Sequence, residues 1–102
     1  DEEITYEVLN QRANNLAEAL TSKGVVSEDI VGVLLDRSTD MIVSILAILK
    51  VGAIYVPIDP EYPEARINYI LQDSNASAII VHSTTKHQTE HTKKELLLIE
   101  IN

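Results

Sequence analysis

Apolar residues along this chain form two kinds of segment that follow each other in alternation. Before Gly24, between Ser38 and Gly52, and over 64–73, they recur at the spacing of an α-helix. Four other stretches, 30–35, 53–56, 78–81 and 96–99, are continuous apolar runs typical of buried strands. This alternation predicts an α/β fold with a mostly parallel β-sheet flanked by helices.

Capping residues mark the ends of the predicted helices. Thr5 is a favourable N-cap, and Gly24 ends the first helix. Ser38 or Thr39 caps the second helix, which is apolar on nearly every side and ends at Gly52. These signals fix the limits of the first two helices.

A strand, a turn and a helix start are predicted over 53–66. The apolar run 53–56 indicates a strand buried on both faces. Pro57 cannot donate a hydrogen bond to a sheet, so it either ends this strand or places it at an edge. Pro63 is expected at or near the first position of the third helix. The polar segment 83–94 is predicted as a short exposed helix or a loop.

Composition indicates one small globular domain. The chain has 102 residues, 45% of them hydrophobic, and a formal net charge of −8. That charge disfavours binding to nucleic acids and to anionic membranes. Cysteine is absent, which excludes disulfides and thiolate chemistry. We find no signal peptide or membrane span in the sequence and expect a cytoplasmic protein.

Phosphate binding by a glycine-rich loop is not predicted. Such a loop needs closely spaced glycines, so that backbone N–H groups can approach the anion. The three glycines of this chain, Gly24, Gly32 and Gly52, lie far apart. The sequence contains neither a P-loop nor a G-x-G-x-x-G motif.

The histidines are weak candidates for chemistry. His87 and His91 lie four residues apart, as in zinc-binding H-E-x-x-H helices, but the glutamate is Glu90 and does not fit that motif. We therefore favour a solvated polar segment. His82 follows a strand, where a hydrogen-bonded structural role is favoured over proton transfer.

Two pairs of carboxylates flank predicted turns, Asp36 with Asp40 and Asp59 with Glu61. Paired carboxylates can perform acid–base chemistry. The favoured interpretation is structural: Asp40 supports a helix start and Asp59 ends a strand, although ligands often bind at the carboxyl ends of parallel strands.

Serines and tyrosines are also assigned structural roles. No serine has the G-x-S-x-G context of a nucleophile, and the tyrosines near the prolines are expected to pack in the core. These residues are Ser38, Ser44, Ser74, Ser83, Tyr55 and Tyr62. From its residues alone, the chain has an α/β fold and no predicted catalytic, cofactor-binding or metal-binding residue.

Two stretches resemble signatures of the adenylation domains of nonribosomal peptide synthetases. Residues 5–10 (TYEVLN) resemble T-Y-x-E-L-N, and 49–60 (LKVGAIYVPIDP) resemble L-K-A-G-x-A-Y-V-P-I-D-P. Val8 replaces the usual glutamate, and Val51 the usual alanine. The resemblance extends from about Thr5 to Val81, and it implies that 1–102 is a fragment of the large N-terminal subdomain.

The resemblance also implies a function for the complete enzyme. Such enzymes use Mg-ATP to activate an amino acid as an aminoacyl adenylate, and pass it to phosphopantetheine on a carrier protein. The family's phosphate loop, amino-acid pocket and catalytic lysine have no counterpart here, so no site residue is carried over. The expected partners are the remainder of the adenylation domain and the condensation and carrier domains.

Two alternatives remain. The chain could be a self-standing interaction module or half of a split enzyme, or it could be a fragment of an acyl- or aryl-CoA ligase. We also expect self-association, because strands 31–35, 53–56 and 78–81 would expose edges and apolar faces without further chain to cover them.

Overall fold

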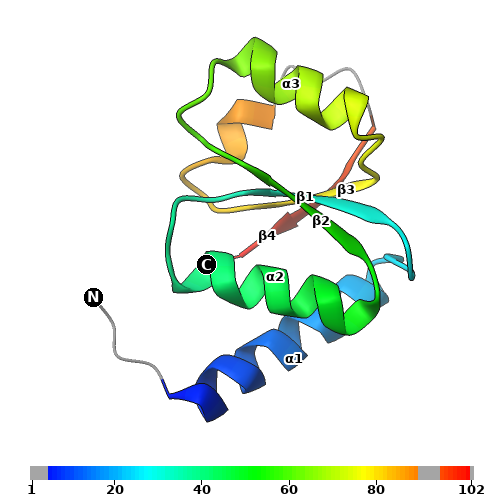
Figure 1. Cartoon of the computed structure of the whole chain (residues 1–102), viewed down its shortest axis with the longest axis vertical. Coiled ribbons are helices and arrows are strands. Elements are labelled where there is room, and N and C mark those ends of the chain that lie inside the picture. The colour runs from blue at the N-terminus through cyan, green and yellow to red at the C-terminus, as the bar shows by residue number, and fades with distance from the viewer. Residues whose placement is uncertain (1–4, 90–94, 102) are drawn as a thin grey trace.

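The fold is a four-stranded parallel sheet between two layers of helices (Figure 1). It was obtained as a computed structural model, and the structure describes residues 5–89 and 95–101. The elements are α1 (Tyr6–Ser22), β1 (Ile30–Leu34), α2 (Thr39–Val51), β2 (Ile54–Ile58), α3 (Glu64–Asp73), β3 (Ala78–Val81), the 3₁₀-helix η1 (Lys86–Thr89) and β4 (Leu97–Glu100). The predicted α/β class is confirmed.

The strands lie in the order β2-β1-β3-β4, and all three neighbouring pairs are parallel. Helices α1 and α2 cover one face of the sheet, and α3 covers the other (Figure 1). β1 and β3 are therefore central strands. The expectation that 31–35 and 78–81 lack cover is wrong, because both are paired on two sides and buried.

The helix limits follow the predicted caps. The Thr5 Oγ1 atom accepts a hydrogen bond of 3.2 Å from the Val8 N–H. Ser38 is the N-cap of α2, and Gly52 ends that helix with φ of 84°, a left-handed conformation that favours glycine. Pro63 immediately precedes α3 as its N-cap.

β2 differs from its prediction. It is an edge strand, and Ile54 and Tyr55 are 51% and 39% exposed, so the expectation of a strand buried on both faces is wrong. Pro57 lies within the strand, opposite Val33 of β1, which confirms the alternative that it marks an edge. The prediction failed because central and edge strands can both have an apolar run. In the order β2-β1-β3-β4, β2 has a neighbouring strand on one side only.

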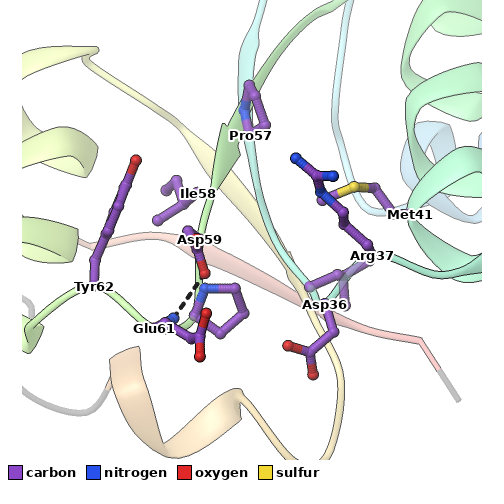
Figure 2. A pocket seen from close by; sticks show the side chains of 10 residues that line it. Asp36, Arg37, Met41, Pro57, Ile58, Asp59, Glu61 and Tyr62 are labelled. Carbon is purple, nitrogen blue, oxygen red and sulfur yellow. Dashed lines mark hydrogen bonds between the residues drawn. The ribbon is translucent and has the colours of Figure 1, made fainter.

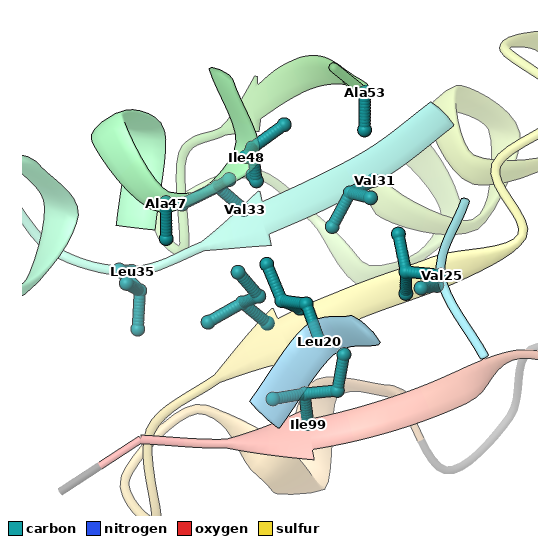
Figure 3. Close-up of a cluster of buried hydrophobic side chains, with 11 residues drawn as sticks. Leu20, Val25, Val31, Val33, Leu35, Ala47, Ile48, Ala53 and Ile99 are labelled. Atoms are coloured by element: carbon teal, nitrogen blue, oxygen red, sulfur yellow. The ribbon is translucent and has the colours of Figure 1, made fainter. Parts of the chain in front are cut away.

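Two apolar clusters hold the helices against the sheet. The cluster between the sheet and the α1–α2 layer includes Leu20, Val31, Val33 and Ile48 (Figure 3). The cluster on the α3 side contains Leu34, Ile58, Ile67, Leu71, Ala76, Ile79 and Val81. Successive β1 residues alternate between the two clusters, because side chains along a strand point to opposite faces.

The polar segment after β3 contains the short helix η1, which is consistent with the prediction, whereas its residues 90–94 lie outside the described part. The last strand runs one residue later than the predicted 96–99. Within residues 5–89 and 95–101, no helix is long and apolar enough to cross a membrane.

Candidate functional site

A pocket of about 520 Å³ opens at the carboxyl ends of β1 and β2 (Figure 2). In open parallel sheets, ligands commonly bind beyond the carboxyl ends of strands. The pocket is lined by Leu35, Asp36, Arg37, Met41, Pro57, Ile58, Asp59, Pro60, Glu61 and Tyr62.

The turn from β1 into α2 forms one wall of this pocket. The Ser38 hydroxyl donates a hydrogen bond of 3.1 Å to the Asp36 carbonyl and accepts one of 3.4 Å from the Met41 N–H. These bonds fix the chain at the start of α2. Arg37 lies between Asp36 and Ser38, and its side chain extends between Met41 and Pro57 (Figure 2).

The turn after β2 forms the opposite wall. One carboxylate oxygen of Asp59 accepts a hydrogen bond of 2.9 Å from the Glu61 N–H, and the Asp59 carbonyl accepts one of 3.1 Å from the Tyr62 N–H. The Gln88 amide donates to the Pro60 carbonyl at 2.5 Å, which ties this turn to η1. The prediction that Asp59 ends a strand is confirmed, because β2 stops at Ile58.

The pocket combines an apolar floor with a charged rim. Leu35 and Ile58 are 2% and 1% exposed and lie at its base. The rim carries three acidic side chains and one basic one: Asp36, Asp59, Glu61 and Arg37. All four charged residues are exposed, so water and salt screen them. The ten lining residues include no serine, cysteine, lysine or histidine, so the pocket can hold a polar group but offers none of these nucleophiles.

A smaller pocket of about 180 Å³ lies at the carboxyl ends of β1 and β3. Here the chain leaves β1 for α2 on one face of the sheet and leaves β3 for η1 on the other face (Figure 1). Such a switch point is the usual ligand crevice of this type of sheet. It is lined by Leu35, Asp36, Ser38, Asp40, His82 and Thr84.

Thr85 bridges the two strands beside this smaller pocket. Its buried hydroxyl donates to the Leu34 carbonyl at 2.8 Å and accepts from the His82 N–H at 3.0 Å. The His82 Nδ1 atom lies 3.3 Å from the hydroxyls of both Ser83 and Thr84. These contacts confirm the interpretation of His82 as a hydrogen-bonded residue at a strand end.

The carboxylate pairs lie where the sequence placed them, around two turns. Asp36 and Asp40 line the smaller pocket together, and Asp59 and Glu61 line the larger one. Asp40 is bound by Arg12 of α1 at 2.6 Å and lies in the first turn of α2, which confirms its role in supporting that helix.

The other candidates are dispersed. His87 lies in η1, and His91 lies outside the described residues. Within residues 5–89 and 95–101, no group of three or more His, Cys, Asp or Glu side chains is arranged to hold a metal ion. Tyr62 packs against the α3-side cluster, as predicted, whereas Tyr55 is exposed, because β2 is an edge strand.

Four serines, which have no nucleophile motif, each make a local hydrogen bond. Ser38 caps α2, and the Ser44 hydroxyl donates to the Asp40 carbonyl at 2.8 Å. The Ser74 hydroxyl donates to the Leu71 carbonyl at 3.4 Å, and Ser83 contacts His82.

All three glycines have structural roles. Gly24 and Gly52 follow helices with positive φ angles of 102° and 84°. Gly32 lies in β1, where a Cβ atom would be 3.1 Å from a methyl group of Leu71. None of the three glycines belongs to a loop of closely spaced backbone N–H groups. These glycines therefore do not form a binding loop for the phosphates of ATP.

Sequence reasoning missed Arg37, Met41 and Thr85. The first two line the larger pocket, and the third joins the ends of β1 and β3. The only available signal was their position directly after or near a predicted strand.

Comparison with known proteins assigns the family. The profile described as "AMP-binding enzyme" matches residues 1–101. The chain belongs to the AMP-binding enzyme family. Bacitracin synthase 2 of Bacillus licheniformis is 44% identical over 90 residues, which are 88% of this chain and 4% of that protein. Tyrocidine synthase 1 of Brevibacillus parabrevis is 48% identical over 81 residues, 79% of this chain and 7% of that protein.

Solved structures agree with this assignment. The holo-AB3403 four-domain nonribosomal peptide synthetase bound to AMP and glycine matches with a TM-score of 0.84 and 29% identity, over 95% of this chain and 7% of that one. The resemblance to adenylation domains of nonribosomal peptide synthetases is thereby confirmed. This chain spans 1% to 7% of the length of the first curated relatives.

Proposed function

We propose that this chain is a structural part of an adenylation domain and is not catalytic by itself. In the complete enzyme, the domain activates an amino acid with ATP and magnesium as aminoacyl-AMP, for transfer to phosphopantetheine on a carrier protein. The observation that carries the proposal is the family match over 1–101 in a chain whose three glycines all serve structural roles. Under this proposal, ATP, magnesium and the amino acid are bound by other residues of the complete domain, outside 1–102.

The proposed contribution of this segment is to support the rest of the domain. The 520 Å³ pocket and the exposed side chains of Ile42 and Leu49 on α2 are surfaces where further polypeptide can pack. The proposed partners are the remainder of the adenylation domain and the neighbouring condensation and carrier domains.

A chimera tests this function. In a peptide-synthetase adenylation domain that is active as a purified protein, the corresponding segment is replaced by residues 1–102. Amino-acid-dependent ATP–pyrophosphate exchange is then measured. We expect the chimera to retain the amino-acid preference of its host, because the segment carries no selectivity residues. A preference that changes with the segment would contradict the proposal.

An alternative assignment is that the chain is half of a split enzyme. Exposed apolar side chains on α2 and β2 favour this alternative; they are Ile42, Leu49, Ile54 and Tyr55. Under this alternative, the separate chain restores exchange when added to an adenylation domain that lacks the segment. Failure to restore activity across cognate pairs would reject it. A CoA-ligase origin is disfavoured, because the relatives at 44% and 48% identity are bacitracin and tyrocidine synthases.

A further inference from the structure

The hydrogen-bonding register of β2 determines which of its backbone groups face outward. The Ile54 N–H donates to the Asp29 carbonyl at 2.8 Å, and Ile54 lies opposite Ile30 in the parallel ladder. In such a ladder, every second residue directs its N–H and C=O groups toward the neighbouring strand. Residues 54, 56 and 58 therefore face β1, and residues 55 and 57 direct their backbone groups away from the sheet.

The outward edge of β2 consequently carries a single N–H donor. Tyr55 contributes an N–H and a C=O group, whereas Pro57 contributes only a C=O group, because proline has no N–H. In the described part of the chain, no backbone hydrogen bond engages the Tyr55 N–H. Pro57 occupies the other outward-facing position of β2. Its missing N–H group therefore removes no hydrogen bond between β2 and β1.

We propose that Pro57 protects the open edge of the sheet, so that β2 does not pair with another extended polypeptide. An unpaired edge with apolar side chains is a template for strand addition, and Ile54 and Tyr55 are both substantially exposed on this edge. Because Pro57 has no N–H group, a strand that added to this edge would find no backbone donor after Tyr55. The ladder that remains possible is shorter than the usual strand of about five or six residues, so it would contribute little stability.

Pro57 also lines the 520 Å³ pocket. A strand added along the carboxyl half of β2 would run past Pro57 and lie beside the pocket. Edge protection therefore keeps this side of the pocket accessible. In the isolated chain, the polypeptide that Pro57 excludes is β2 of a second copy, since like edges can pair about a two-fold axis.

Replacing Pro57 tests the proposal. Pro57→Val restores the outward N–H with a residue that suits a strand, and Pro57→Ala is the second variant if valine disturbs folding. Sedimentation velocity over a range of concentrations measures association, and circular dichroism verifies the fold. We expect the association constant to rise at least tenfold, and exchange of the residue-57 amide hydrogen to slow as concentration increases.

Two controls isolate the N–H group. Pro60→Ala removes a proline from the turn beyond β2 and should leave association unchanged. In the Pro57→Val background, Tyr55→Pro removes the other outward donor and should reverse the gain, whereas Tyr55→Ala should reverse it less. A folded Pro57→Val or Pro57→Ala protein that sediments as the parent does, with concentration-independent exchange at residue 57, would overturn the proposal.

Discussion

The hydroxyl of Thr85 donates a hydrogen bond of 2.8 Å to the carbonyl of Leu34, across 51 residues of sequence. The same oxygen accepts from the His82 N–H, so one buried side chain joins the carboxyl ends of β1 and β3. These two strands border the switch point of the sheet. Their separation there is fixed by a specific polar contact as well as by apolar packing.

Thr85→Val is expected to destabilise the chain. Valine has a similar shape but leaves the Leu34 carbonyl and the His82 N–H without this partner, which costs about 1–3 kcal/mol in the free energy of unfolding. Urea unfolding followed by circular dichroism measures the change. Thr85→Ser retains the hydroxyl and should lose less stability. Equal losses in the two variants would show that packing of the methyl group is what matters.

Gly32→Ala is expected to destabilise the α3 side of the sheet. The new Cβ atom would lie 3.1 Å from Leu71 and 3.4 Å from Ile58, both buried, and such overpacking costs about 1–3 kcal/mol in unfolding free energy. In a double-mutant cycle, Leu71→Val should relieve part of that cost and give non-additive free energies. Strict additivity would contradict the close contact.

Asn68→Leu is expected to stabilise the protein. The Asn68 Oδ1 atom is buried and has no hydrogen-bond partner in the part of the chain that the structure describes. Removing an unsatisfied buried acceptor should raise the unfolding free energy by about 1 kcal/mol, which thermal unfolding detects. Asn14→Leu, on the exposed side of α1, is the matched control and should gain little. A loss of stability in Asn68→Leu would mean that this oxygen is satisfied.

Leu49→Glu is expected to weaken the predicted self-association of the isolated chain. Leu49 and Ile42 are 55% and 51% exposed, and their spacing of seven residues places them on one face of α2, where they form an exposed apolar surface. A charge there should lower the weight-average mass at a given concentration in light scattering. Asn14→Glu, on the exposed side of α1, adds the same negative charge away from this surface and is the control. A parent chain that is strictly monomeric would contradict the prediction.

Local signals were sufficient to predict most of the fold. Thr5 and Ser38 are the N-caps of α1 and α2, and Gly52 is the C-cap of α2. Each of these residues determines a helix end through contacts within the same helix, so the limits could be predicted from the sequence. β1 and β3 are apolar on both faces, as central parallel strands are. The sheet class followed from the alternation of these elements with helices.

Sheet order and the pockets could not be predicted in the same way. The run 53–56 has the composition of a central strand, and only the order β2-β1-β3-β4 places it at an edge. Pro57 was the one local indication of this. Arg37 and Glu61 meet at one pocket because β1 and β2 are neighbours, a long-range fact that neither segment encodes alone.

The most direct test of the central claim is amino-acid-dependent ATP–pyrophosphate exchange by the purified 102-residue chain, first shown to be folded, across all standard amino acids. We predict no exchange above the blank, because its three glycines all serve helix ends or packing. Exchange that depends on one amino acid would contradict this account and would require a separate ATP site within these residues.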